Sequence, residues 1–219
     1  MSPVNGIYDS GIRPKISAVI SALNEKGTIG EVVARSLLHV DEVIVIDDGS
    51  TDGTPTIAET HGAKVLINEM NLGVLPSLKR GFQAATGDIW VTLDADGQHD
   101  PDDIPALVAP ILTDEADLVL GKRPEIPYFS EKVIALLTSL KVKVGDASTG
   151  FRAIRRNFGE KMGVHGSCPC GTFILEAHSL GARVAEVSIN VRERSESERR
   201  IKTRHLTQVL HVIHDLLRY

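Results

Sequence analysis

The stretch 89–100, IWVTLDADGQHD, decides the fold of this chain. It begins with apolar and β-branched residues and changes to acidic and amide residues within a few positions. A short, continuous apolar run bounded by polar residues is typical of a strand buried on both faces of a parallel sheet. In such sheets, ligands bind beyond the carboxyl ends of the strands. The stretch therefore predicts a buried strand with Asp94 and Asp96 at the ligand-binding edge of a sheet.

Strand and helix patterns alternate around this stretch. The β-branched runs are 15–22 (KISAVISA), 41–47 (DEVIVID), 63–67 (AKVLI), 89–94 (IWVTLD) and 116–121 (ADLVLG). Segments with helical spacing lie between them, at roughly 28–38, 54–61, 74–86 and 104–112. Such alternation predicts an α/β fold with a central, mostly parallel sheet flanked by helices.

The second half of the chain has a different pattern. It predicts helices at 130–141 and 172–180, strands at 151–155 and 183–192, and an amphipathic terminal helix at 205–217. The sequence contains no internal repeat, low-complexity tract or obvious linker. At 219 residues it is long enough to bury a core, so a single domain is expected.

Charge and cysteine content exclude some classes of protein. The net charge of −5 argues against a nucleic-acid-binding protein, although a local basic cluster at 192–204 needs an explanation. Cys168 and Cys170 form Cys-Pro-Cys, which cannot build a disulfide framework. We interpret them as small buried residues in a reducing compartment rather than as metal ligands.

Neither an export signal nor a membrane span is evident in the sequence. The first fifteen residues are polar and of mixed charge, and the apolar runs fall far short of the ~20 residues that cross a bilayer. We expect a cytoplasmic protein, at most peripheral on the cytoplasmic face of a membrane. The segment 127–143 (PYFSEKVIALLTSLKVK) is consistent with an interfacial helix and equally with an ordinary packed helix.

Two adjacent carboxylates, Asp47 and Asp48, end the second predicted strand and begin the turn DDGSTDGT (47–54). Turn chemistry alone would explain the glycine, serine and threonine residues that follow. It does not explain the adjacent carboxylates, whose mutual repulsion requires a compensating partner. A nucleotide base or ribose that offers hydrogen-bond donors would be such a partner.

The sequence Asp94-Ala95-Asp96-Gly97-Gln98 follows the fourth predicted strand. Its oxygen-only donors suit Mg²⁺ or Mn²⁺, which take one or two carboxylates together with substrate phosphates. A second Asp-x-Asp, at 100–102, precedes a predicted helix, where acidic residues are expected from the helix dipole. We interpret His99 as a turn residue, or as a residue that supports the metal ligands, rather than as a ligand itself. Dinucleotide-binding and P-loop motifs are absent from the sequence, which argues against an oxidoreductase or a P-loop NTPase.

Six blocks of sequence together resemble the family-2 glycosyltransferases of GT-A fold, a Rossmann-like fold, and specifically the dolichyl-phosphate mannose synthase branch. The blocks are SALNE (21–25), VIVIDDGSTDGT (43–54), NLGVLPSLKRGFQAATGDIWVTLDADGQHDP (71–101), LVLGKR (118–123), DASTGFRAIRR (146–156) and VSINVRERSESERRIK (187–202). They occur in the order of the family and are spread over residues 21–202, most of the length of the chain. The resemblance implies a single GT-A domain over 1–219, with a nucleotide-binding half (1–123) and an acceptor-binding half (124–219).

The resemblance also implies roles for particular residues. A base and ribose pocket would be lined by Ala22, Leu23, Glu25, Val45 and Asp47. Mg²⁺ or Mn²⁺ on the donor diphosphate would be bound by Asp94, Asp96 and Gln98, with Ala95 beside it and Arg123 approaching the donor. Arg194 and Arg200 would contact phosphate, which would explain the basic cluster. Asp96, Arg194 and Arg200 are the residues expected to act in catalysis.

The sequence departs from the family pattern at two places. Ser21 and Leu23 replace a proline and an aromatic residue of the family's first block, which leaves guanine and uracil both open as the donor base. Arg199 and Arg200 stand where the family has Ser-Lys, a change that keeps the positive charge.

The implied reaction is inverting transfer of a hexose, mannose or glucose, from a GDP- or UDP-sugar to a polyprenyl (dolichyl) phosphate. Such an acceptor is already ionised and needs cations, for example Arg194, Arg200 and Arg152, rather than a strong base. A hydroxyl acceptor would need a carboxylate base, such as Asp146 or Glu176. A non-catalytic nucleotide-sugar-binding subunit also remains open. A sugar nucleotidyltransferase fits less well, because its basic Gly-rich loop is replaced here by Asn24-Glu25.

Overall fold

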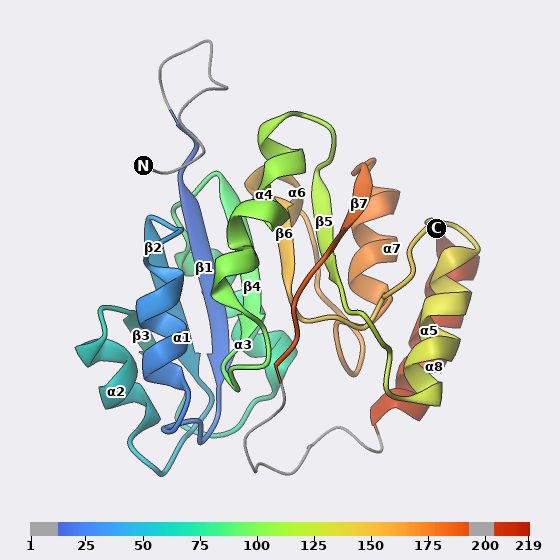
Figure 1. Ribbon diagram of the computed structural model, residues 1–219. Coiled ribbons are helices and arrows are strands. Elements are labelled where there is room, and N and C mark those ends of the chain that lie inside the picture. The colour runs from blue at the N-terminus through green and yellow to red at the C-terminus, as the bar shows by residue number, and fades with distance from the viewer. Residues whose placement is uncertain (1–12, 193–203) are drawn as a thin grey trace.

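A computed structural model describes residues 13–192 and 204–219, which form a layered α/β domain (Figure 1). The strands are β1 (Ile16–Ala22), β2 (Glu42–Asp47), β3 (Lys64–Ile67), β4 (Ile89–Asp94), β5 (Leu118–Lys122), β6 (Arg152–Arg155) and β7 (Val184–Ser188). The helices are α1 (Ile29–Ser36), α2 (Thr54–Thr60), α3 (Val74–Ala84), η1 (Pro101–Asp103), α4 (Ile104–Leu112), α5 (Phe129–Ser139), α6 (Arg156–Gly159), α7 (Thr172–Ser179) and α8 (Arg204–Arg218).

The described strands make one seven-stranded sheet in the order β3-β2-β1-β4-β6-β5-β7. Strand β1 pairs in parallel with β2 and β4, and β5 pairs in parallel with β7. Strand β6 runs antiparallel between β4 and β5. The prediction of a mostly parallel sheet flanked by helices is therefore confirmed.

Helices cover both faces of the sheet, because its strands carry apolar residues at almost every position. In Figure 1, α1 and α4 lie in front of the sheet and α3, α6 and α7 lie behind it, with α5 and α8 packed together beside β7. Alternate side chains enter the two cores, so that Val19 faces α3 and Ile20 faces the side of α1. Helix α3 approaches closely at Gly81, where an added Cβ would lie 2.3 Å from Val19 Cγ1. The expected buried sheet thus positions its strand ends rigidly.

The expected strand at 183–192 is too long, because β7 ends at Ser188. Beyond that residue, the chain exchanges sheet bonds for bonds to the loop after β4. The Asn190 amide donates to Asp103 Oδ2 (2.7 Å), and the Arg192 amide donates to the carbonyl oxygen of Gln98 (2.9 Å). An isolated bridge pairs Val191 with His99. Residues 189–192 therefore run from the sheet to the turn that follows Asp94.

The remaining expected elements were correct to within a few residues, and two short helices, η1 and α6, were not predicted. These helices span three and four residues, too few to show a helical period in the sequence. Among the helices that the structure describes, none combines the length and the apolar composition needed to cross a bilayer.

Candidate functional site

The carboxyl ends of β1, β2 and β4 lie side by side at one edge of the sheet. Strand register places Asp47 beside Ala22 and Asp94 beside Ser21. Figure 1 shows the three strands ending together at the lower edge of the domain. The structure therefore brings together the two acidic strand ends that the sequence placed at a ligand edge.

Asp47 has a carboxylate oxygen that no described residue pairs with. The residue is 1% exposed, and its Oδ2 accepts a hydrogen bond from the Ser50 amide (3.0 Å). Its Oδ1 is buried and has no hydrogen-bond partner in the described part of the chain. Buried polar atoms are almost always paired, so this oxygen indicates a missing donor. A ribose hydroxyl or a base N–H would supply one.

Asp48, the neighbouring carboxylate, is fully engaged inside the protein. It accepts hydrogen bonds from the backbone amides of Leu72 (2.9 Å) and Gly73 (2.8 Å) and from Asn68 Nδ2 (2.9 Å). It therefore holds the loop between β3 and α3. The sequence argument expected a nucleotide to compensate the two adjacent carboxylates. For Asp48, groups of the protein itself are the compensating partners.

The loop after β1 is tied to the turn after β2 and to the turn after β4. Asn24, at φ 52°, accepts a hydrogen bond from the Thr51 amide (2.8 Å), and the Glu25 amide donates to Thr54 Oγ1 (2.8 Å). Thr28 Oγ1 donates to the carbonyl oxygen of Ala95 (2.8 Å). These bonds make a single wall from three loops, and we call it the donor wall.

The other residues expected in the base and ribose pocket take different positions. Leu23 and Glu25 are partly exposed in the loop of the donor wall. Ala22 (2% exposed) and Val45 (0%) belong to the apolar core on the α1 side of the sheet. Ala22 lies at a strand end beside Asp47, whereas Val45 lies deeper in β2.

The turn after β4 presents Asp94 to solvent and folds Asp96 back on itself. The side chain of Asp94 is 55% exposed, and Asp96 Oδ1 accepts a hydrogen bond from the Gln98 amide (3.1 Å). His99 is 5% exposed, accepts a hydrogen bond from the Asp94 amide at Nδ1 (3.2 Å) and stacks on Phe151. His99 thus lies in the turn, as expected, and its Nδ1 is also 3.5 Å from Asp94 Oδ2. Ala95 is buried beneath the turn.

Gly150, in the loop before β6, fixes the space around the Asp94 carboxylate. A Cβ added at Gly150 would lie 2.7 Å from Asp94 Oδ1. The Gly150 carbonyl oxygen accepts a hydrogen bond from Thr92 Oγ1 (2.7 Å), which holds the loop against β4. The absence of a side chain at this position thus lets the carboxylate take its place.

A divalent cation fits this turn if a substrate completes its coordination. Within the described ranges, no cluster of three or more His, Cys, Asp or Glu residues could hold a metal unaided. Asp94, Asp96 and Gln98 offer two carboxylates and one amide oxygen, the kind of partial set that Mg²⁺ accepts alongside phosphate oxygens and water.

Arg123 lies at the centre of a buried ion-pair cluster. Its Nε and Nη2 donate to Asp146 (2.6 and 3.0 Å), and Nη2 also donates to Glu131 (3.0 Å). Burial alone would raise the pKa of Asp146, but hydrogen bonds and charge from Arg123 outweigh it and hold that pKa below its usual value. Both carboxylate side chains are 1% exposed. We call these three residues the Arg123 cluster.

Glu176, the other carboxylate considered as a base, is also engaged in the structure. It accepts hydrogen bonds from the amides of Gly163 (2.6 Å) and Val164 (3.0 Å), and His165 Nδ1 lies 3.4 Å from it. Asp146 therefore holds the guanidinium of Arg123 in place, and Glu176 holds two backbone amides.

Arg152, in β6, is a buried arginine with unused donors. It is 2% exposed, its guanidinium carbon lies 4.9 Å from the centre of the Phe173 ring, and its Nε and Nη2 have no acceptor in the described part of the chain. Burial lowers its pKa, and the neighbouring Cys170, Cys168, Asp94 and Asp146 oppose that shift. The guanidinium of Arg152 thus lies close enough to Asp94 for the two groups to interact electrostatically.

Arg194 and Arg200 lie outside the described residues. Arg192, the last residue described before them, bonds to the turn after β4 through its amide. Its guanidinium pairs with Glu31 (2.9 Å) and Asp100 (3.1 Å). The chain therefore enters the expected basic segment directly beside Gln98.

Cys168 and Cys170 are buried free thiols in the core formed with α7 and α8. His165, their nearest histidine in sequence, pairs with Asp215 (2.9 Å) instead. The interpretation of the two cysteines as small core residues is confirmed.

Comparison with known proteins agrees with this geometry. A model of glycosyl transferase family 2 matches residues 17–173. An undecaprenyl-phosphate 4-deoxy-4-formamido-L-arabinose transferase of Shewanella sediminis is 31% identical over 206 residues, which cover 84% of this chain and 60% of the relative. A dodecaprenyl-phosphate galacturonate synthase of Rhizobium johnstonii is 33% identical over 135 residues, 56% of this chain and 40% of the relative. The chain thus spans less than two thirds of these two relatives.

Solved structures extend the likeness to the whole described fold. Glucosyl-3-phosphoglycerate synthase of Mycobacterium tuberculosis, in complex with Mn²⁺, uridine diphosphate and phosphoglyceric acid, superposes with a TM-score of 0.74 at 31% identity. The match covers 94% of this chain and 78% of that one. The same enzyme has been solved with Mg²⁺ and uridine diphosphate. The expected GT-A fold is confirmed, and the chain belongs to glycosyl transferase family 2.

Proposed function

We propose that this chain is a metal-assisted, inverting glycosyltransferase that moves a sugar from a nucleoside-diphosphate sugar to a polyprenyl phosphate. The observation that carries the donor half of the proposal is the pair of strand ends, the orphaned Oδ1 of Asp47 and the exposed carboxylate of Asp94. The acceptor half rests on the polyprenyl-phosphate acceptors in the names of the two relatives.

On the donor side, Asp47 would accept a hydrogen bond from the ribose or base, in a pocket with Ala22, Leu23, Glu25 and Val45. Asp94, Asp96 and Gln98, with Ala95 beside them, would hold Mg²⁺ or Mn²⁺ on the diphosphate. The metal would neutralise charge on the departing diphosphate. The donor is a GDP- or UDP-hexose (mannose or glucose), and the uridine diphosphate bound by the mycobacterial neighbour favours the latter nucleotide.

In the transfer step, an oxygen of the acceptor phosphate forms a bond to the anomeric carbon. The bond from that carbon to the diphosphate breaks, and the nucleoside diphosphate leaves with the electron pair. An ionised phosphate needs no base, which agrees with the engagement of Asp146 and Glu176 inside the protein. Arg123 would approach the donor from its cluster.

Positive charge is needed to hold two phosphates in one site. Arg152 supports this role, because its Nε and Nη2 have no acceptor among the described residues. We propose the same role for Arg194 and Arg200, and the bond between the Arg192 amide and the Gln98 carbonyl oxygen in the turn after β4 supports it. Residues 1–123 would then serve mainly the nucleotide and residues 124–219 mainly the acceptor.

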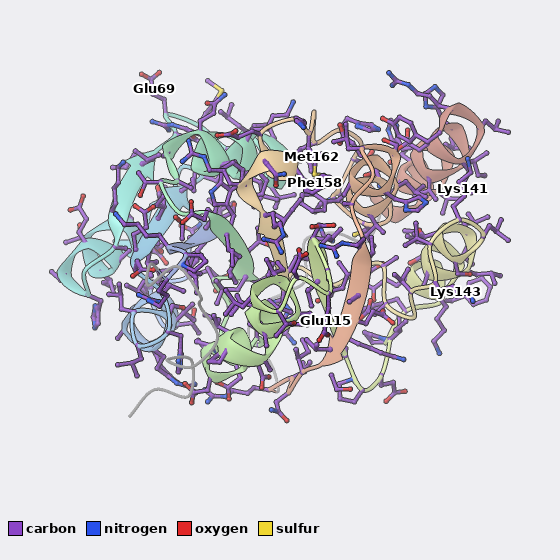
Figure 2. All side chains as sticks on the ribbon, turned by 90° about the horizontal axis from the view of Figure 1, so that it is seen from above. Glu69, Glu115, Lys141, Lys143, Phe158 and Met162 are labelled. Carbon is purple, nitrogen blue, oxygen red and sulfur yellow. The ribbon has the colours of Figure 1, made fainter. Side chains whose placement is uncertain are left out.

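Contact with a membrane surface on its cytoplasmic face is part of this proposal. Helix α5 exposes Phe129 and Leu136, its capping residue Leu140 is also exposed, and Figure 2 shows Lys141 and Lys143 at the end of the molecule opposite Glu69. Apolar side chains with lysines at their border suit an anionic lipid surface.

A second candidate is transfer to a small phosphorylated acceptor. The mycobacterial neighbour, solved with phosphoglyceric acid, covers more of this chain than either relative does. A chain that binds nucleotide sugars without turnover is the third candidate.

The experiment is a matrix of radiolabelled GDP- and UDP-sugars against farnesyl phosphate and 3-phosphoglycerate, with Mn²⁺ or EDTA. We expect label to enter the lipid phase with at least one donor, to require Mn²⁺, and to fall about a thousandfold in Asp96→Asn, because an interaction with the leaving diphosphate is lost. Asp102→Asn, in the second Asp-x-Asp, is the matched control and should retain activity. Label in phosphoglycerate alone would support the second candidate, and tight binding without transfer would support the third.

A further inference from the structure

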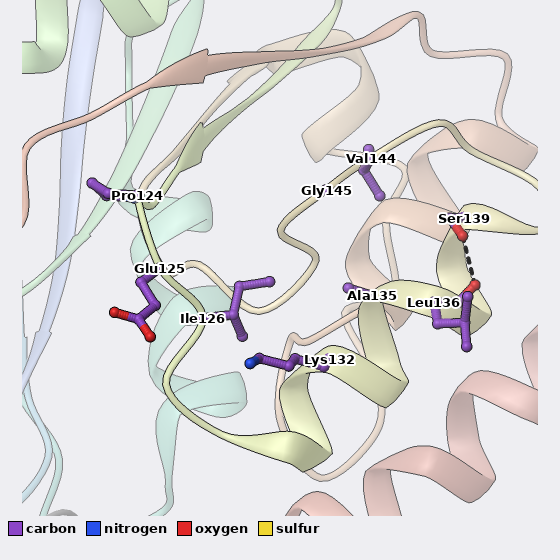
Figure 3. A pocket seen from close by; sticks show the side chains of 9 residues that line it. All are labelled: Pro124, Glu125, Ile126, Lys132, Ala135, Leu136, Ser139, Val144 and Gly145. Carbon is purple, nitrogen blue, oxygen red and sulfur yellow. Dashed lines mark hydrogen bonds between the residues drawn. The ribbon is translucent and has the colours of Figure 1, made fainter.

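A cleft with a volume of about 480 Å³ lies between helix α5 and the loop that follows β5 (Figure 3). The loop contributes Pro124 and Ile126, and the helix contributes Ala135 and Leu136. Val144 closes it from the segment after α5. Its size falls in the range of small-molecule sites, ~300–1,000 Å³.

Both walls of the cleft start at the Arg123 cluster. Pro124 directly follows Arg123, and Gly145, which lines the cleft, directly precedes Asp146. Glu186 of β7 fixes this end, because its Oε1 accepts hydrogen bonds from the amides of Gly145 and Asp146 (both 2.8 Å). A ligand that reaches the sugar-transfer site past Arg123 would therefore leave its tail in this cleft.

The lining of the cleft is mainly apolar, and it also includes the charged residues Glu125 and Lys132 and the hydroxyl of Ser139. Figure 3 shows Ile126 from the loop and Lys132 from α5 extending toward one another. An exposed apolar surface extends from Leu136 (66% exposed), which lines the cleft, to Leu140 (71%), the residue that caps α5 one helical turn further on. The aliphatic side chains of these walls would offer no hydrogen-bond partners to a small polar acceptor such as phosphoglycerate.

We propose that this cleft binds the first isoprene units of the polyprenyl phosphate acceptor, with Lys132 beside the phosphate end and the rest of the chain leaving over Leu136. This inference rests on the proposed function. Methyl-branched isoprene units match the aliphatic walls at Ile126, Ala135 and Val144. The cleft would thus give the acceptor half its specificity for a lipid.

The test compares Leu136→Asp, in α5, with Leu140→Asp, at the residue that caps the end of α5. Both residues are exposed, so neither change should unfold the protein, but only Leu136 lines the cleft. The probe is farnesyl phosphate below its micelle concentration, and the measurements are its Kd by calorimetry and its KM in sugar transfer. Binding of nucleoside diphosphate with Mn²⁺ serves as the check that the donor site is intact.

We expect Leu136→Asp to raise both constants about tenfold, because a charge is placed against an apolar chain, and Leu140→Asp to leave them nearly unchanged. A second variant, Ala135→Leu, should also weaken farnesyl phosphate by filling the cleft. Equal constants for Leu136→Asp and the unaltered protein would overturn the proposal, as would equal losses in both aspartate variants, which would indicate a general lipid surface.

The proposed function can fail separately. Binding of farnesyl phosphate that depends on Leu136, without transfer of any sugar, would keep the cleft assignment and reject the enzyme. Transfer to farnesyl phosphate that ignores Leu136 would keep the enzyme and reject the cleft. If the unaltered protein neither binds nor uses farnesyl phosphate, both proposals fall.

Discussion

The donor wall and the Arg123 cluster both concentrate carboxylates at the same edge of the sheet, but they use them in opposite ways. Beside the donor wall, the side chain of Asp94 is 55% exposed, and Asp47 Oδ1 has no partner in the described part of the chain. In the cluster, Asp146 and Glu131 are buried and fully occupied by Arg123. Carboxylates without protein partners can serve a ligand, whereas paired ones hold the fold. Residue type alone does not separate these roles, and pairing does.

The largest effect should come from removing the cation of the cluster. Arg123→Met leaves two buried carboxylates without their partner, and we expect a loss of about 3–5 kcal/mol in the free energy of unfolding. Urea unfolding of the two proteins measures the difference. Arg156→Met, which removes an exposed pair with Glu160, is the control and should leave the urea midpoint unchanged. Equal midpoints for the two variants would show that the cluster contributes no stability.

A sharper form of the comparison sets the neighbouring carboxylates Asp47 and Asp48 against each other. Asp48→Asn should lower the free energy of unfolding, measured with urea, by about 1–3 kcal/mol. The reason is that Asp48 accepts hydrogen bonds from two backbone amides and one side-chain amide. Asp47→Asn should change stability little and weaken nucleoside-diphosphate binding in calorimetry. The reverse result, with Asp47 needed for stability and Asp48 for binding, would contradict the division of roles.

The smallest effect should come from crowding Asp94 without removing it. Gly150→Ala places a methyl group 2.7 Å from Asp94 Oδ1, so the carboxylate must move. We expect the half-saturating concentration of Mn²⁺ in sugar transfer to rise about fivefold to tenfold, on the basis that a displaced ligand weakens metal binding. Gly27→Ala, where the added Cβ meets nothing within 4 Å, is the control. An unchanged Mn²⁺ requirement in Gly150→Ala would separate Asp94 from metal binding.

Much of the fold was predictable, because its strands are continuous apolar runs with one explanation. Strand 89–94 and helix 104–112 match the structure at both ends. Strand 183–192 does not, since its alternating residues continue while the chain leaves β5 for Asp103 and Gln98. Local sequence carries the alternation but not the partner.

The site was predictable where a residue ends a strand and not where a long-range contact defines its role. Asp94 follows from its position alone. The internal partners of Asp48, at Asn68, Leu72 and Gly73, and the contact of Gly150 with Asp94 depend on folding. The buried state of Arg152 is equally hidden, because an arginine in a strand normally indicates an exposed face.

The connection of residues 190–192 to the turn after β4 has a consequence for the order of folding. The bond between Asp48 and Gly73 spans 25 residues, whereas the bond between Asn190 and Asp103 spans 87 and that between Arg192 and Glu31 spans 161. Contacts between distant parts of a chain require larger loops to close and form slowly. The contacts of Asp48 can therefore form before residues 190–192 bond to the turn after β4. We therefore expect the sheet to assemble first, and residues 190–192 to join the edge that carries Asp94 later.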